Sequence, residues 1–178
     1  MPEPLPKTMA DRGTFWTQAP DWRSVVLQYD SWTARPVLGL HRLLVSGNLD
    51  AALGMFAPAV PSIGLWQVAA GSVHPIRVGR DRMLLTAAKP LVATPGWNAS
   101  GFAVSPATDA YVTIEISGPG LRALVSEMTF ADLEEGSPSA ATLVCGQQAL
   151  LHRVDEQTAR IHVEAPLGTY VWHWLETR

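Results

Sequence analysis

The C-terminal part of the sequence has the clearest pattern of apolar and polar positions. Between Ala110 and Glu176 the period of the apolar residues changes several times. The order of these periods predicts a strand, a helix, three strands and a closing helix. The first strand is predicted over residues 111–116, where aliphatic side chains occupy every second position. We therefore expect one face of this strand to be buried.

A helix is predicted directly after this strand. Gly118-Pro119-Gly120 forms the turn, and Ser117 is the candidate cap. Proline is tolerated there because its missing N–H would have no partner in a first helical turn. The apolar residues then recur at i, i+3, i+4 and i+7, at Leu121, Leu124, Val125 and Met128. This spacing gives the helix one apolar stripe, which we expect to lie on the sheet.

Three more strands and a helix complete this region. The strands are predicted over 141–145, 149–154 and 158–163, joined by short polar turns. The closing helix opens at Pro166, and its apolar residues fall at helical spacing.

The first half of the chain repeats the same order of strands, one helix and a meander. Asn48 is the predicted N-cap of a helix over 49–56. Strands are predicted over 25–27, 35–45, 65–68, 72–78 and 83–86. The prolines and glycines between residues 89 and 110 predict a crossover between the two halves.

Together these patterns predict an α+β fold of two related β-α-β meander half-modules packed together. The half-modules span about residues 21–88 and 102–178, and they form a single domain over 21–178. Residues 1–20 carry four prolines and no periodicity, which predicts an extended N-terminal arm.

Composition excludes several classes of protein. With 47% apolar and 16% charged residues, the chain can bury a sizeable core. A net charge of −3, with two lysines (Lys7 and Lys89) among 13 basic residues, leaves no basic stripe for nucleic acid. The N-terminus lacks the pattern of a secretory signal, and the apolar stretches are too short to span a bilayer. We therefore expect a cytoplasmic protein that does not act at membranes.

The sequence offers few groups for chemistry. Its histidines, at positions 41, 74, 152, 162 and 173, have no metal-ligand spacing, although His152 and His162 fall on adjacent predicted strands. The glycine motifs that cradle phosphates and the nucleophile elbow are both missing. The single cysteine, Cys145, lies in an apolar strand and is expected to act as a small hydrophobe. We predict no catalytic, cofactor-binding or metal-binding residues in this chain.

Seven tryptophans are many for 178 residues, and interfaces are enriched in this residue. On the closing helix, Trp172 and Trp174 project about 200° apart, so that Trp172 faces outward if Trp174 faces the sheet. We predict Trp16, Trp22 and Trp172 as a partner interface. The alternative is a tryptophan-rich core, in which the arm around Trp16 and Trp22 folds back over Trp172.

Several segments resemble a known family. Ile116 to Leu124 (ISGPGLRAL), Phe130 to Leu133 (FADL), Ala141 to Val144 (ATLV) and Tyr170 to Leu175 (YVWHWL) resemble the gamma subunit of heterotetrameric sarcosine oxidase. Gly136 and, more weakly, Val78 to Leu85 agree with the same pattern. Those proteins belong to the wider group of the glycine-cleavage T-protein and its folate-binding relatives.

The resemblance implies a fold similar to the folate-binding domain of T-protein and a non-catalytic, structural role. The chain would be a gamma-type subunit that docks on a large alpha-type subunit, in a complex that also holds a flavoprotein beta-type subunit. Such a complex would oxidatively demethylate sarcosine or a related N-methyl amino acid with FAD, FMN and NAD. It would pass the one-carbon unit to tetrahydrofolate. The chain itself would bind none of these cofactors.

Two other interpretations stay open. The chain could act alone as a T-protein-like folate-binding protein or aminomethyltransferase. Folate-using relatives carry acidic residues at the start of the strand that corresponds to Ala149–Val154, whereas Gln147 and Gln148 stand there in this sequence. The missing carboxylate removes a general base at that point.

The chain could also be a homo-oligomeric interaction domain unrelated to amine oxidation. A gamma-type chain expressed alone could also form a homo-oligomer.

Overall fold

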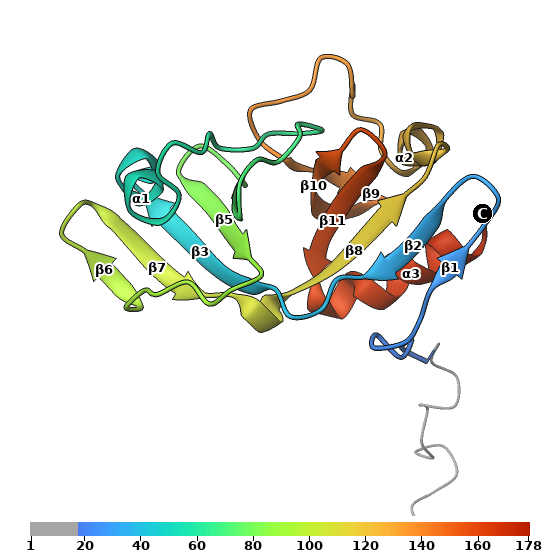
Figure 1. Cartoon of the computed structure of the whole chain (residues 1–178), viewed down its shortest axis with the longest axis horizontal. Coiled ribbons are helices and arrows are strands. Elements are labelled where there is room, and N and C mark those ends of the chain that lie inside the picture. Colours follow the sequence, from blue (N-terminus) through green and yellow to red (C-terminus); the bar gives the residue numbers. More distant parts are fainter. Residues whose placement is uncertain (1–17) are drawn as a thin grey trace, which may run out of the picture.

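The structure, a computed structural model, describes residues 18–178. Two antiparallel sheets and three helices make up this part of the chain (Figure 1). The six-stranded sheet has the order β1-β2-β8-β11-β10-β9, and the five-stranded sheet has the order β4-β5-β3-β7-β6.

The bounds of the elements are as follows. The six-stranded sheet contains β1 (Leu27–Gln28), β2 (Thr33–Pro36), β8 (Tyr111–Ser117), β9 (Ala141–Val144), β10 (Gln147–Asp155) and β11 (Thr158–Glu164). The five-stranded sheet contains β3 (His41–Gly47), β4 (Val73–Arg77), β5 (Arg82–Ala87), β6 (Gly96–Asn98) and β7 (Phe102–Pro106). The helices are α1 (Leu49–Phe56), α2 (Leu121–Met128) and α3 (Gly168–Glu176), with short 3-10 turns η3 (Thr108–Ala110) and η4 (Ala165–Leu167).

The predicted order of the C-terminal region is confirmed from β8 to α3. All four residues of the apolar stripe on α2 are buried. They pack with Ile114, Ile116 and Ile161 on one face of the six-stranded sheet, and α3 adds Val171 and Leu175 to the same cluster. This outer core therefore forms because alternate residues of the strands meet the stripes of two helices.

The two glycines before α2 are required because Ser31, in the loop between β1 and β2, lies very close to them. A Cβ on Gly118, whose φ is +133°, would lie 2.6 Å from the carbonyl oxygen of Ser31, and one on Gly120 would lie 2.7 Å from Ser31 Oγ. The N–H of Gly120 donates to the carbonyl of Ser31 at 2.8 Å. The predicted cap is wrong: Gly120 occupies the N-cap position, and Ser117 Oγ instead bonds Thr33 Oγ1 at 2.9 Å. The two glycines thus allow the β1–β2 hairpin to pack against the start of α2.

The prediction of one strand over 35–45 is wrong. The chain leaves the six-stranded sheet after Pro36 in β2 and enters the five-stranded sheet at His41 in β3. Pro36 has no N–H for the ladder, and Gly39 has φ +72°, a left-handed conformation that favours glycine. These two residues break the strand, and the short link between them joins the two sheets.

The two sheets are not divided at the predicted crossover. Strands β1 and β2 join the C-terminal strands, while β6 and β7, which follow residue 88, join the strands of the first half. Strand β6 itself lies in the predicted crossover. The strand predicted over 65–68 is also wrong, because Leu65 and Val68 form only isolated bridges, to Ser137 and Arg153.

Two further cores complete the fold. Helix α1 covers the outer face of the five-stranded sheet, packing with Val45, Leu85 and Phe102. Its predicted cap is confirmed, since Asn48 Oδ1 accepts from the N–H of Ala51 at 3.2 Å. A smaller cluster contains apolar residues from both sheets, among them Ile76 and Leu150. Within residues 18–178, no helix is both long and apolar enough to cross a membrane.

Candidate functional site

The faces of the two sheets opposite the helices carry a group of polar side chains. Alternation along β8 places Thr113 and Glu115 on the face opposite Ile114 and Ile116. In the register of the sheet Thr113 pairs with His162, and Arg160 pairs with both Glu115 and His152. Together with residues of β3 and β4, these side chains form what we call the inner polar layer: Arg42, His74, Thr113, Glu115, His152, Arg160 and His162.

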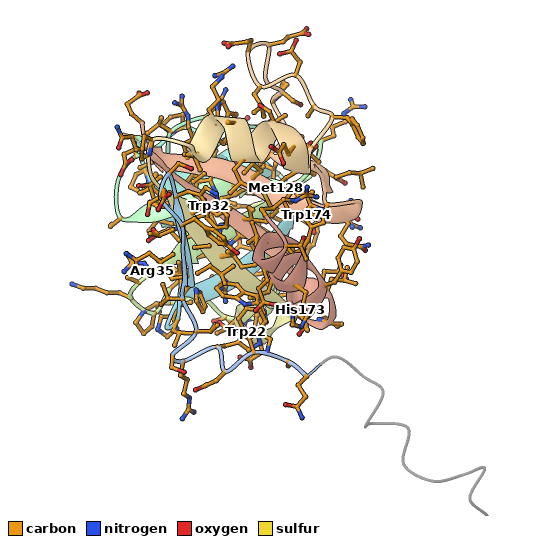
Figure 2. The ribbon with its side chains drawn as sticks, turned by 90° about the vertical axis from the view of Figure 1, so that its right-hand side faces the viewer. Trp22, Trp32, Arg35, Met128, His173 and Trp174 are labelled. Atoms are coloured by element: carbon orange, nitrogen blue, oxygen red, sulfur yellow. The ribbon has the colours of Figure 1, made fainter. Side chains whose placement is uncertain are left out.

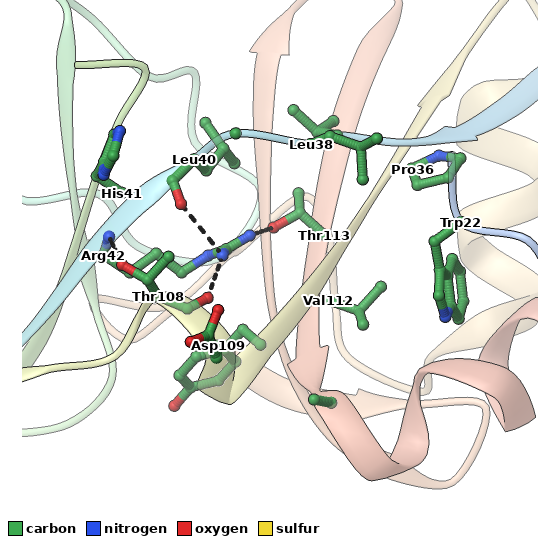
Figure 3. Close-up of a pocket in the computed structure, with 14 residues that line it drawn as sticks. Trp22, Pro36, Leu38, Leu40, His41, Arg42, Thr108, Asp109, Val112 and Thr113 are labelled. Carbon is green, nitrogen blue, oxygen red and sulfur yellow. Dashed lines mark hydrogen bonds between the residues drawn. The ribbon is translucent and has the colours of Figure 1, made fainter. Parts of the chain in front are cut away.

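Arg42 connects the two sheets within this layer. Its side chain is 5% exposed. Nη1 donates to the carbonyl oxygens of Thr108 at 2.7 Å and Leu40 at 3.4 Å, and Nη2 donates to Thr113 Oγ1 at 2.7 Å (Figure 3). Thr113 Oγ1 in turn bonds His162 Nδ1 at 2.8 Å. The guanidinium of Arg42, on β3, is therefore bonded to η3 and to β8. Through Thr113 it is also connected to His162 on β11.

The charge of Arg42 has no carboxylate partner within 4.0 Å among the described residues. Burial lowers the pKa of its guanidinium, and the nearby charge of Asp109 opposes that effect. An arginine side chain stays protonated in proteins even so. The carbonyl oxygens around it therefore supply the main local compensation for a buried positive charge.

Glu115 is the buried carboxylate of the layer. Its Oε1 accepts from Arg35 Nη2 at 2.7 Å, and its Oε2 accepts from Arg160 Nε at 2.9 Å. Burial raises the pKa of this carboxyl, but the hydrogen bonds from the two arginines outweigh burial and leave the pKa below its usual value. Because both oxygens are occupied by cations, Glu115 is a poor candidate for a general base.

Three histidines lie together deeper in the layer. His152 and His162 are 0% exposed and stack with their ring centroids 5.2 Å apart, and His74 meets His152 edge-on at 5.7 Å. Within the described chain, both ring nitrogens of His152 and Nε2 of His162 have no hydrogen-bond partner. No set of three or more metal-ligating side chains in residues 18–178 is arranged to hold an ion.

Burial and cationic neighbours keep these histidines neutral. Burial, followed by the charges of His74 and Arg160, lowers the pKa of His152 to about 3. Burial, followed by repulsion from His152 when that residue is protonated and from Arg42 and Arg160, lowers the pKa of His162 well below its usual value. Burial and Arg160 also lower the pKa of His74. At neutral pH the cluster therefore carries no charge of its own.

A cavity of about 350 Å³ lies beside Arg42, at the link between β2 and β3 (Figure 3). Its walls are mainly apolar, with Leu38, Leu40, Val112 and Trp22 among them. The polar groups on Arg42, Thr108 and Thr113 are bonded to one another, and His41, Asp109 and Tyr111 also line the cavity. The groups that hold Arg42 are therefore not free to orient a substrate.

Cys145 is buried and unpaired. Burial raises the pKa of its thiol to about 12, against a smaller opposing effect of Arg178. A thiol with this pKa supplies almost no thiolate at neutral pH, so Cys145 is a poor nucleophile.

The predicted orientation of the tryptophans on α3 is wrong. Trp172 is 0% exposed, and its Nε1 donates to Glu176 Oε1 at 3.0 Å. Trp22 packs edge-on against it, with ring centroids 5.8 Å apart. Trp174 is half-buried instead, and the Arg178 guanidinium lies 3.9 Å from the centre of its ring. Figure 2 shows Trp22, His173 and Trp174 at this end of the molecule.

Trp172 is thus a core residue, as the alternative required, because the segment around Trp22 covers it. Trp16 lies outside the described residues. Trp22 is half-buried, and a role for it and for Trp16 at a partner interface stays a prediction.

Most of the inner polar layer could not be found from the sequence. The alternation of Thr113 and Glu115 along one strand was a usable signal, and His152 and His162 do lie on adjacent strands. Arg42 and His74 belong to the other sheet, so only the packing of the sheets brings them to this layer.

Comparison with solved structures identifies the fold. One chain of the heterotetrameric sarcosine oxidase from Corynebacterium sp. U-96, solved in complex with pyrrole 2-carboxylate, matches with a TM-score of 0.64. The match has 23% sequence identity and covers 81% of each chain. No protein-family model and no curated protein matches the sequence. The chain therefore has a fold found in a subunit of a heterotetrameric oxidase.

The burial of Trp172 predicts that its substitution destabilises the fold more than substitution of Trp174. We expect Trp172→Ala to lower the free energy of unfolding by about 3–5 kcal/mol, since it leaves a cavity beneath Trp22. Trp174→Ala removes a half-exposed ring and should cost clearly less. Urea titrations of both variants measure this difference, and an equal or larger loss for Trp174→Ala would contradict the packing described for α3.

The histidine cluster predicts a loss of stability in mild acid. The pKa values are lowered in the folded chain, so the unfolded chain binds more protons as pH falls below about 6.5. Each buried histidine should then remove on the order of 1.4 kcal/mol per pH unit. Stability is full above that pH and declines toward pH 5. Over this range Glu115 stays ionised, because its pKa is also lowered.

Urea midpoints measured from pH 8 to pH 5 test this prediction. His152→Leu should flatten the decline, because it removes the buried histidine whose pKa is lowered to about 3. An unchanged slope for His152→Leu would show that His152 is not the source of the acid sensitivity.

Proposed function

We propose that this chain is a non-catalytic, gamma-type subunit of a sarcosine oxidase-like complex. The observation that carries the proposal is the fold, which aligns over 81% of both chains with a subunit of a heterotetramer. The motifs in α2 and α3 that resemble the gamma subunit lie within the same architecture. The proposal includes a relation between this fold and the folate-binding domain of the T-protein group.

The state of the inner polar layer supports a structural role. Glu115 is bonded to two arginines, Arg42 is bonded to carbonyl groups and Thr113, and the buried histidines are neutral. Catalysis requires titratable groups that converge on an accessible position. Here the buried groups hold strands together and are shielded from a substrate.

The surface supports a role in assembly. Several large apolar side chains are exposed, among them Val92 at 96%, Trp97 at 75% and Phe130 at 105%. Aromatic side chains are enriched at protein interfaces and often contribute much of the binding energy. Such side chains on the outside, together with a closed polar interior, fit a chain that acts by contacting other subunits.

In this proposal the chemistry belongs to the partners. The complex would demethylate sarcosine or a related N-methyl amino acid oxidatively and transfer the one-carbon unit to tetrahydrofolate. A large alpha-type subunit and a flavoprotein beta-type subunit would hold FAD, FMN, NAD and tetrahydrofolate. This chain would dock on the alpha-type subunit and stabilise the assembly.

Co-expression with alpha-type and beta-type subunits from the same organism tests the proposal. We expect a stoichiometric complex by size-exclusion chromatography with light scattering, and sarcosine-dependent flavin reduction in that complex. The chain purified alone should show neither flavin absorbance nor demethylase activity. Failure to assemble with those subunits, or a stoichiometric flavin on the isolated chain, would contradict the proposal.

A further inference from the structure

A second, smaller cavity lies at the outer edge of the five-stranded sheet. It measures about 280 Å³ and lies between α1, β6, β7 and the loop before β6. Its lining residues are Met55, Phe56, Val92, Ala93, Thr94, Trp97, Asn98, Phe102 and Val104, none of which is charged. We call this cavity the β6 groove.

The β6 groove exposes large apolar side chains above a rigid floor. Met55, Val92 and Trp97 are 53%, 96% and 75% exposed. Phe56 and Phe102 form the floor, with ring centroids 6.1 Å apart in an edge-on contact. Phe102 is also fully buried in the core under α1. The groove is thus an opening in the sheet's own core, and its rim is apolar.

The backbone beside the groove is also available for pairing. Strand β6 is at the edge of the five-stranded sheet, and in the described chain it pairs only with β7. Edge strands of this kind are usually protected by charged residues, especially lysine, against pairing with another chain. Residues 90–108, which include β6 and β7, contain no Asp, Glu, Lys, Arg or His. This edge therefore lacks charged protection, and only its short length and the preceding Pro95 limit pairing with another chain.

We propose that the β6 groove receives an extended, uncharged apolar segment of the larger partner subunit, which pairs with the free edge of β6. This inference rests on the proposed function and assigns one docking surface to it. A charged side chain placed here would lose its hydration without gaining a counter-charge. The segment must therefore present apolar or aromatic side chains between Met55 and Trp97. Its main-chain groups would bond β6, as in other cases of strand addition.

The size of the groove favours a larger partner over a second copy of this chain. A stable interface buries about 800 Å² on each partner. Three exposed side chains and a three-residue strand offer less than that, so two copies joined only through β6 would be weakly held. A larger subunit can cover the groove and continue over the neighbouring surface.

The groove lies at the opposite end of the molecule from the first described residue (Figure 1). Gln18, the first described residue, is held at α3, where its carbonyl oxygen contacts His173 Nε2 at 3.2 Å. Figure 1 places α3 and β6 at opposite ends of the molecule. The groove is therefore also distinct from the surface around Trp22.

Charge placed in the groove tests the proposal in the co-expressed complex. Trp97→Glu and Val92→Glu should each weaken assembly at least 100-fold, while leaving the thermal midpoint of the isolated chain within a few degrees of wild type, because both side chains are exposed. Leu143→Glu is the matched control, since it adds the same charge at an exposed apolar residue outside the groove. It should assemble like wild type. Hydrogen exchange should also show greater protection of residues 96–98 in the complex than in the isolated chain, because the amides that face away from β7 gain partners.

The outcomes separate this inference from the proposed function. If the wild-type chain assembles and Trp97→Glu and Val92→Glu assemble equally well, the groove is not the docking surface, although the proposed function stands. If wild type fails to assemble, both are overturned. A homodimer of the isolated chain that Trp97→Glu dissociates would assign the groove to a second copy. Protection of 96–98 in the isolated chain that Trp16→Ala removes would assign it to the N-terminal segment.

Discussion

The arrangement of the two sheets depends on a buried positive charge. Arg42 lies on β3, just after the link at which the chain leaves one sheet for the other, and its guanidinium reaches across to Thr113 on β8. A buried cation without a carboxylate is costly unless its N–H groups are bonded. Two carbonyl groups and Thr113 bond its terminal nitrogens Nη1 and Nη2, while Nε has no hydrogen-bond partner among the described residues. The link, the turn η3 and the central strand of the larger sheet must therefore stay in register with one another.

The bonds that hold the two sheets together leave few buried polar groups free for catalysis or binding. The buried polar side chains hold the sheets together, and burial keeps the histidines among them neutral. The groups left free lie on the outside, at the apolar edge of β6 and at exposed side chains such as Phe130. A protein with this distribution is suited to binding other proteins.

The spacing of apolar residues predicted the helices and strands that depend on nearby residues in the sequence. It did not predict the features that depend on contacts between distant parts of the chain. The stripe of α2 and the alternation of β8 follow from spacing alone, so the order from β8 to α3 was correct. The break at Pro36 and Gly39 was missed because residues 35–45 are apolar enough to read as one strand. The burial of Trp172 depends on Trp22, which is 150 positions away along the chain and reaches α3 only in the folded state. Arg42 and His74 were missed for the same reason.

A double-mutant cycle between Arg42 and Thr113 tests the central claim most directly. Arg42→Met, Thr113→Val and the double variant would be compared with wild type by urea titration at pH 7.5. Because the two side chains share one hydrogen bond within the same network, we expect each single change to destabilise the chain. The double variant should lose less than the sum, by about 1–3 kcal/mol. Losses that add to within about 0.5 kcal/mol would show that the two residues act independently, and that this contact does not hold the sheets together.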